Sequence, residues 1–264
     1  MMIRYIALDL DGTLLNDESK LSETTIKTIK KINNYYNLII ISGRHYYEIK
    51  EIVNVLCLKS NTIIISCDGQ YISTIDNNII KTFDFLDFLD LKYITNNVKG
   101  KRINFYTDTV NYTVINCNCF FSIIKSIIKR EHIKYSSVLE NKKIYIEKIS
   151  IEGVKKIDIE KLKIKYNINI LKNGRVEILN KKVSKFKALS YLFSGEQLDE
   201  ILYFGDDNND YDCFVNMKHC VAMSNSNKSI LKIAKTITNS NNEDGVSNYL
   251  SNFIKKMVTD NEKD

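Results

Sequence analysis

Two acidic residues, Asp9 and Asp11, follow directly after an apolar segment, residues 3–8, that has the length of a buried strand. Gly12 then permits a sharp turn, and Thr13 adds a hydroxyl group. Ligands of open α/β sheets bind beyond the carboxyl ends of the strands, which is where both carboxylates are expected. Carboxylates in that position can bind a divalent cation, and one of them can attack a phosphoryl group. An acidic turn that caps a helix is the simpler alternative.

A second acidic cluster, residues 205–210 (Gly-Asp-Asp-Asn-Asn-Asp), also follows an apolar segment. Its side chains fit the first three ligand positions of a calcium-binding loop. That loop also needs glycine at its sixth position and glutamate at its twelfth, and Tyr211 and Met217 stand there instead. A helix start lined with capping side chains remains as an alternative. Because two acidic strand ends of one parallel sheet can meet, both clusters together predict one Mg²⁺ site built from hard oxygen ligands.

Two further segments could bind an anion. Ser42-Gly43-Arg44 follows the apolar residues 38–41, so the Ser42 hydroxyl and the Gly43 amide could bind a phosphate group at a helix start. An ordinary helix cap explains this segment equally well. Lys185 stands at the start of another predicted helix, where its positive charge opposes the helix dipole. A solvated surface lysine is the alternative, whereas an anion bound there would make the charge favourable.

The first and last parts of the chain alternate between strand and helix. This βαβ order predicts a parallel sheet with helices on both faces. The predicted strands are residues 3–8, 38–41, 62–66, 201–204 and 221–223, and the predicted helices are 22–34, 46–58, 184–193, 208–215, 228–234 and 246–257.

The middle of the chain has a different pattern, with neighbouring strands joined by short turns. This pattern predicts a separate antiparallel α+β unit inserted into the parallel one. The change of pattern begins at a hairpin, residues 71–75 and 79–83. Predicted helices follow at 85–96, 120–129 and 159–166, with predicted strands at 102–107, 112–115, 144–150, 168–171 and 176–179.

Composition excludes several classes of function. The chain has 264 residues with 44% hydrophobic and 27% charged side chains, which excludes general disorder. Its net charge of +6 is spread out without a Lys/Arg block, so no nucleic-acid surface is expected, and a mildly basic surface favours small anionic substrates. No apolar segment is long enough to span a membrane. Residues 1–15 lack the apolar core of a signal peptide, so cytoplasmic residence is expected.

The six cysteines are scattered, and we expect free thiols. Cys117 and Cys119 are closely spaced, but their spacing and that of the three histidines match no zinc-binding pattern.

Taken together, the four motifs resemble those of the haloacid dehalogenase superfamily, and specifically the Cof-type phosphatases. They occur in the family's order over nearly the whole chain, and the segments 221–225 and 243–246 are similar to the family's ending. The resemblance implies a Rossmann-like, doubly wound parallel sheet as the catalytic core, residues 1–79 and 183–264. It also implies an inserted α+β cap, residues 80–182, that sets substrate specificity.

The resemblance also implies a reaction and a role for each motif residue. The reaction is the Mg²⁺-dependent hydrolysis of small phosphate monoesters, such as sugar phosphates or phosphorylated cofactors. Asp9 would form an aspartyl-phosphate, and Asp11 would act as acid and base. Mg²⁺ would bind the Asp9 carboxylate, the Asp11 carbonyl and Asp206, with Asp210 orienting Lys185 or a metal-bound water. The phosphate group would bind to Leu10, Ser42, Gly43, Lys185 and Asn209.

Three positions depart from the family pattern. Asp68-Gly69-Gln70 stands where Asn-Gly-Ala is usual, Phe186 replaces the glycine usual after the lysine, and serines flank the late Asn225. None of these changes removes a catalytic group. An acid at position 68 near the site could, however, repel strongly anionic substrates.

Residues outside the four motifs could set specificity. Arg44, Arg102, Arg175 and the pair at 142–143 are candidates for substrate contact, although a surface role explains each of the cap residues better. A phosphomutase of the same superfamily and a phospholigand-binding protein without turnover remain as alternatives. A dehalogenase is disfavoured because its chemistry does not need Asp11 as an acid. The substrate's identity and the oligomeric state stay open at this stage.

Overall fold

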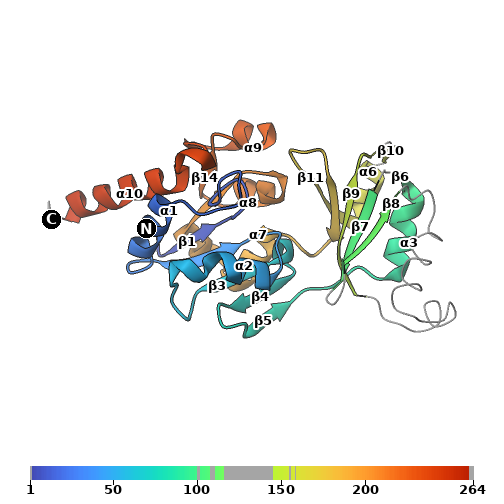
Figure 1. Ribbon diagram of the computed structural model, residues 1–264, viewed down its shortest axis with the longest axis horizontal. Helices are drawn as coiled ribbons and strands as arrows, with labels where there is room; N and C mark the ends of the chain where they lie inside the picture. The colour runs from blue at the N-terminus through green and yellow to red at the C-terminus, as the bar shows by residue number, and fades with distance from the viewer. Residues whose placement is uncertain are drawn as a thin grey trace. The chain divides into compact units, whose positions relative to one another are not determined.

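The computed structural model of the protein describes residues 2–99, 102–107, 111–115, 145–154, 156–157 and 159–261 (Figure 1). The chain divides into two compact units, the first formed by Met1–Thr82 with Ser184–Asp264 and the second by Phe83–Val183. The second unit is therefore an insertion into the first.

The first unit is built on one mixed sheet whose strand order is β15-β14-β13-β1-β2-β3-β4-β5. The first six strands in this order are parallel, which confirms the predicted α/β sheet. These six are β1 (Tyr5–Leu8), β2 (Asn37–Ile41), β3 (Ile63–Ser66), β13 (Ile201–Gly205), β14 (His219–Met223) and β15 (Thr236–Thr238).

Two features of this sheet differ from the sequence interpretation. The predicted hairpin, β4 (Tyr71–Thr74) and β5 (Ile79–Thr82), extends the main sheet antiparallel to β3, so this sheet continues beyond the expected end of the segment at residue 79. The short strand β15 was not predicted, because three residues give too little periodicity to recognise.

Alternation along the strands decides which helices cover which face. Side chains of one parity, such as Ile6, Leu8 and Ile40, share a buried cluster with residues of α1, α2 and α10. Among the other helices of this unit, α7 packs against α8, and α8 packs against α9. The bounds are α1 (Glu23–Ile32), α2 (Tyr46–Val53), α7 (Lys185–Leu192), α8 (Tyr211–Asn216), α9 (Lys228–Ile233) and α10 (Gly245–Asn261).

The second unit contains an antiparallel sheet of order β11-β12-β9-β7-β8, as predicted for the inserted segment. Leu91 and Ile94 of one helix and Leu162 of another pack with the sheet in a separate apolar cluster. The strands are β7 (Arg102–Thr107), β8 (Asn111–Ile115), β9 (Ile146–Glu152), β11 (Tyr166–Ile170) and β12 (Val176–Asn180), the helices are α3 (Phe88–Asn97) and α6 (Ile159–Lys165), and β6 (Val98–Lys99) pairs with β10 (Lys156–Ile157).

Some expectations lie outside the described residues, namely the helix at 120–129, the lysine pair at 142–143, and Cys117 and Cys119. No helix in the described part of the chain has both the length and the apolar sequence needed to cross a membrane.

The start of α7 gives a testable prediction about stability. Ser184 caps this helix, because its hydroxyl oxygen accepts a hydrogen bond from the Lys187 amide over 3.2 Å. Replacing Ser184 with alanine should lower the free energy of unfolding by about 1 kcal/mol, measured by urea denaturation. The exposed Ser190 of the same helix is the matched control, and Ser190→Ala should change little. Equal effects of the two substitutions would contradict the capping role.

Candidate active site

The candidate site lies at the point where the chain changes its direction of travel across the sheet. Strands β1 and β13 are neighbours, and from β1 the chain continues to β2 on the opposite side of β1 from β13. Such a switch point leaves a crevice beyond the carboxyl ends of the two strands. Asp9 directly follows β1, and Asp206 directly follows β13. The topology therefore brings together two acids that are almost 200 positions apart in the sequence.

Gly12 is needed because the turn after β1 passes very close to Asp206. Its φ angle is +76°, and a Cβ atom added there would lie 2.4 Å from Oδ2 of Asp206. The neighbouring Thr13 hydroxyl donates a hydrogen bond to Asp206 Oδ1 over 3.2 Å. On the other side, the Asn225 amide donates to the Gly12 carbonyl oxygen over 2.9 Å. The turn and the second acid are thus held together directly.

Lys185 lies at the centre of this site and is not a surface lysine. Its side chain is 0% exposed, and its Nζ atom donates to Asp9 Oδ1 over 2.6 Å and to Asp210 Oδ1 over 2.7 Å. Burial by itself would lower the pKa of Lys185, but the carboxylates of Asp210 and Asp9 outweigh it and raise the pKa well above its usual value. The unfavourable charge at the start of α7 is therefore balanced by two carboxylates.

Asp210 uses both of its oxygens for hydrogen bonds within the protein. Oδ1 accepts from Lys185 and from the Tyr203 hydroxyl, over 2.7 and 2.5 Å. Oδ2 accepts from the backbone amides of Asp206 and Asp207, over 2.8 and 3.0 Å. A carboxylate has about four acceptor positions, so Asp210 has little capacity left for a metal ion. We therefore assign it to orienting Lys185 and the loop after β13.

Asp9 and Asp206, which lie beside Asp210, could bind a divalent cation. One oxygen each from Asp9, Asp206 and Asp210 can be chosen so that all three lie within 4.8 Å of one another, and all three residues are buried. Among the residues whose burial the structure describes, Lys185 is the only lysine or arginine that is equally buried. Burial, together with the charges of Asp210 and Asp206, raises the pKa of Asp9 well above its usual value despite Lys185. A divalent cation bound to the hard oxygens of Asp9 and Asp206 would lower the pKa of Asp9 and favour its ionised form.

Asp11 lies closer to solvent, with its side chain 50% exposed, and is held by Arg44. Two hydrogen bonds join them, from Nε of Arg44 to Oδ2 over 2.7 Å and from Nη2 to Oδ1 over 2.6 Å. A planar guanidinium that binds both carboxylate oxygens fixes the orientation of the acid. The structure places Arg44 against Asp11, and the predicted contact of Arg44 with substrate stays a prediction.

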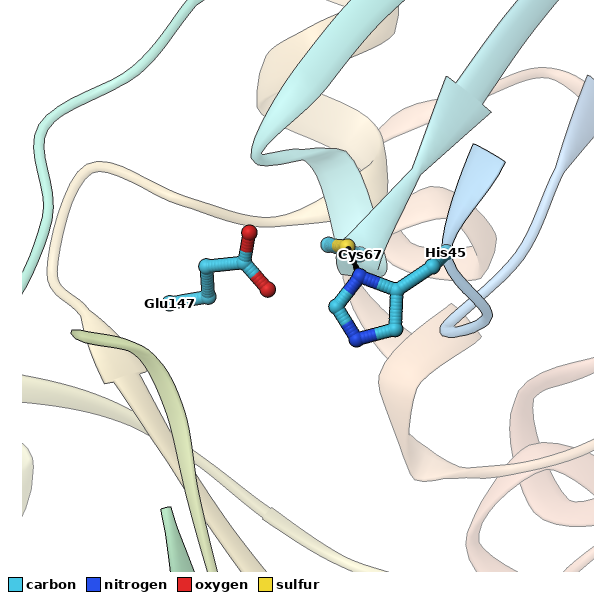
Figure 2. A group of neighbouring side chains, drawn as sticks. All are labelled: His45, Cys67 and Glu147. Atoms are coloured by element: carbon cyan, nitrogen blue, oxygen red, sulfur yellow. Dashed lines mark hydrogen bonds between the residues drawn. The ribbon is translucent and has the colours of Figure 1, made fainter. Parts of the chain in front are cut away.

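The loops after β2 and β3 are tied together beside these residues. The Asp68 amide donates to the Ser42 carbonyl oxygen over 3.0 Å, and the Cys67 amide donates to that of Arg44 over 2.9 Å. The His45 Nδ1 and Cys67 Sγ atoms also lie 3.3 Å apart (Figure 2). These contacts couple the positions of the two loops.

Two of the residues predicted to bind phosphate, Ser42 and Asn209, lie at this junction. Ser42 is buried, and its hydroxyl oxygen accepts a hydrogen bond from the Arg44 amide. The Asn209 side chain donates to Asp68 Oδ1 over 2.9 Å. Leu10 is fully buried, as expected for a residue that offers only its backbone amide.

The two arginines suggested for substrate contact in the inserted unit have acidic neighbours within that unit. Arg102 lies 3.7 Å from Glu152, and Arg175 lies 3.2 Å from Glu177. These ion pairs explain both residues structurally, so their contact with substrate stays a prediction.

Sequence reasoning did not find the partners of these residues. Tyr203, the Arg44–Asp11 pair and the Asp68–Asn209 contact were all missed as parts of the site. Tyr203 did carry a signal, because a tyrosine inside a fully buried strand needs a partner for its hydroxyl group. The other two contacts join separate loops, and no local pattern indicates them.

Comparisons with known proteins agree with this architecture. The family model of haloacid dehalogenase-like hydrolases matches residues 6–250. A candidate phosphatase of Buchnera aphidicola, BU028/BU029, is 31% identical over 100% of this chain and 99% of its own length. The Bacillus subtilis enzyme YcsE, named a 5-amino-6-(5-phospho-D-ribitylamino)uracil phosphatase, is 26% identical over 96% of each chain. A solved haloacid dehalogenase-like hydrolase from B. subtilis has a TM-score of 0.68 at 20% identity, covering 94% of this chain and 99% of its own.

Removing one charge of the buried network should be costly. Asp210 now accepts four hydrogen bonds, and Asp210→Asn would replace one acceptor oxygen with an NH₂ group that can only donate. We expect the free energy of unfolding to fall by about 3–5 kcal/mol, as when one partner of a buried ion pair is removed. Asp212, partly exposed on α8, is the matched control, and Asp212→Asn should change stability by less than about 0.5 kcal/mol. A small effect of Asp210→Asn in urea denaturation would contradict the network.

Gly12 and Gly174 allow steric contact to be separated from backbone strain. Both have nearly the same φ, +76° and +77°, but a Cβ atom at Gly174 would meet nothing within 4 Å. Gly174→Ala should therefore show only the strain, about 1–2 kcal/mol. Gly12→Ala should cost about 1–3 kcal/mol more, because it must displace Asp206. The same loss of unfolding free energy in both variants would contradict a close approach at Gly12.

Proposed function

Because this chain belongs to the haloacid dehalogenase-like hydrolases, we propose that it is a Mg²⁺-dependent phosphatase of small phosphate monoesters. The observation that carries the proposal is the buried Lys185, whose ammonium group contacts the carboxylates of Asp9 and Asp210. A cation held against a carboxylate at the switch point of the sheet is suited to binding a phosphate group next to a nucleophile.

Asp9 is the proposed nucleophile. Its carboxylate would attack phosphorus, so that an Asp9–phosphorus bond forms while the bond from phosphorus to the leaving oxygen breaks. Water would then attack the aspartyl-phosphate and break the Asp9–phosphorus bond. Splitting hydrolysis into two displacements lets the protein activate one group at a time. The hydrogen bond from Lys185 fixes the direction of the Asp9 carboxylate in both steps.

Asp11 is the proposed proton carrier. It would donate a proton to the leaving alcohol in the first step and take one from the attacking water in the second. Its partial exposure gives it access to both, and Arg44 holds its carboxylate by two hydrogen bonds. Arg44 is thus a positioning residue in this proposal.

Mg²⁺ would be held by the carboxylates of Asp9 and Asp206 and by the Asp11 carbonyl. When bound, it would supply positive charge against the negative charge that develops on the phosphoryl oxygens. Thr13 and Asn225 keep the turn that carries these groups in place. Asp210 does not join the ligands in this proposal, because its oxygens are already engaged.

The phosphate group would be held by the backbone and side-chain donors of the neighbouring loops. These are the Leu10 and Gly43 amides, the Ser42 hydroxyl, the Lys185 ammonium and the Asn209 amide. Each follows a strand of the parallel sheet or starts a helix, so the donors converge without a dedicated binding element.

A small phosphorylated metabolite is the proposed substrate. YcsE is named for a phosphorylated ribitylaminouracil, which is a polyol phosphate, and this supports testing sugar- and polyol-like monoesters first. We further propose that the inserted unit, Phe83–Val183, sets specificity and that the enzyme meets its substrate in the cytoplasm.

The direct test is a phosphate-release screen over phosphorylated metabolites, including the YcsE substrate, with Mg²⁺ and with EDTA. Wild-type protein should release phosphate only with Mg²⁺. Asp9→Asn should lower kcat by at least about a thousandfold, because it removes the nucleophile. The partly exposed Asp212→Asn variant should retain the wild-type rate.

Four results would count against the proposal. Turnover by Asp9→Asn would exclude the aspartyl-phosphate route, and turnover in EDTA would exclude the metal. A need for a bisphosphate activator would favour a phosphomutase. Tight binding of phosphorylated compounds with no release in a broad panel would favour a binding protein.

A further inference from the structure

Asp68 is a buried acid that the proposed reaction does not use. Its side chain follows β3 and only 1% of the residue is exposed. Its backbone is left-handed, with φ 55° and ψ 26°, a conformation that among non-glycine residues suits asparagine and aspartate best. Either residue would fit this backbone, so its shape alone does not explain why a charge is placed here.

The Asp68 carboxylate lies among the residues proposed to bind phosphate. Oδ1 accepts the hydrogen bond from the Asn209 side chain over 2.9 Å. Both carboxylate oxygens lie 3.0 Å from the place where a Cβ atom on Gly43 would be. A side chain at position 43 would therefore crowd the Asp68 carboxylate. The Asp68 amide donates to the Ser42 carbonyl oxygen. Asp68 also acts electrostatically on Lys185 and contributes to its raised pKa.

Four of the five proposed phosphate-binding residues therefore touch Asp68 or feel its charge. Lys185 contacts two carboxylates directly, those of Asp9 and Asp210, and Asp68 is a third carboxylate whose charge acts on it. Buried charges interact strongly, because little water separates them. A phosphate dianion that binds to these donors would come close to this carboxylate.

We propose that Asp68 is a specificity-determining residue whose negative charge weakens the binding of phosphate dianions at this site. Repulsion from Asp68 offsets part of the attraction from Lys185, so the site holds both the substrate phosphate group and the product, inorganic phosphate, less tightly. Weak product binding favours turnover in a compartment that contains free phosphate. This inference rests on the proposed function, because it takes the same donors as the phosphate site.

The charge of Asp68 can be separated from its hydrogen bond. Asparagine keeps the left-handed backbone, and its Oδ1 can still accept from Asn209, but it carries no charge. Asp68→Asn should therefore fold normally and keep Asn209 in place. Asp212→Asn is the matched control, because it removes the same charge from a partly exposed position on α8. Urea denaturation of both variants checks that each is folded.

The experiment is calorimetric titration of each protein with inorganic phosphate in Mg²⁺, followed by kinetics on whichever monoester is hydrolysed. Asp68→Asn should bind phosphate about tenfold more tightly than wild type, and KM should fall more than kcat changes. Asp212→Asn should match wild type within about twofold. Unchanged or weaker phosphate binding by a folded Asp68→Asn variant would overturn the inference.

The outcomes for this inference and for the proposed function can be told apart. Monoester hydrolysis by wild type without tighter phosphate binding by Asp68→Asn overturns this inference alone. Tighter phosphate binding by Asp68→Asn, with no hydrolysis by wild type in the screen, supports the inference and overturns the phosphatase. If neither protein binds phosphate and wild type hydrolyses no monoester in the screen, both ideas are wrong.

Discussion

The first unit depends on one costly arrangement, the burial of the Lys185 ammonium group among carboxylates. A buried ammonium is tolerated only if its charge is balanced and its donors are used. Asp9 and Asp210 meet both needs, and Tyr203 and two backbone amides in turn hold Asp210. This single contact joins the ends of β1 and β13 to the start of α7. A change in any of the three elements would leave an uncompensated charge in the core.

The same arrangement gathers several buried carboxylates at the site. Asp206 and Asp68 are buried nearby in addition to the two partners of Lys185. In the proposed reaction, a divalent cation bound to these oxygens would offset part of their charge before an anionic substrate binds. In the proposed function, the balance between these charges would set how tightly a phosphate group is bound. If Asp68 weakens phosphate binding as proposed, substitutions at this position would change that balance without altering Asp9 or Asp11.

Close approach of backbone segments matters as much as charge. Gly12 lets the turn after β1 pass beside Asp206, and Gly43 lets the loop after β2 pass beside Asp68. In each case the missing side chain makes space for a carboxylate that comes from another loop. Hydrogen bonds between the loops after β2 and β3 then hold these two loops together. The described residues of the site are therefore held in place by the sheet and its turns.

The sequence by itself determined the alternation of strands and helices, the parallel sheet and the four motifs, because each is written in local periodicity and spacing. It gave the helix starts at Ser22 and Ser184 and the acids after β1 and β13 in the same way. Only the tertiary structure decided that Lys185 is buried rather than solvated, that Arg44 holds Asp11, and that Asp68 holds Asn209. These contacts join residues 33 to 176 positions apart, and their partners are chosen by strand order and loop packing. Local sequence patterns do not indicate these partners, because strand order and loop packing bring them together only in the folded sheet.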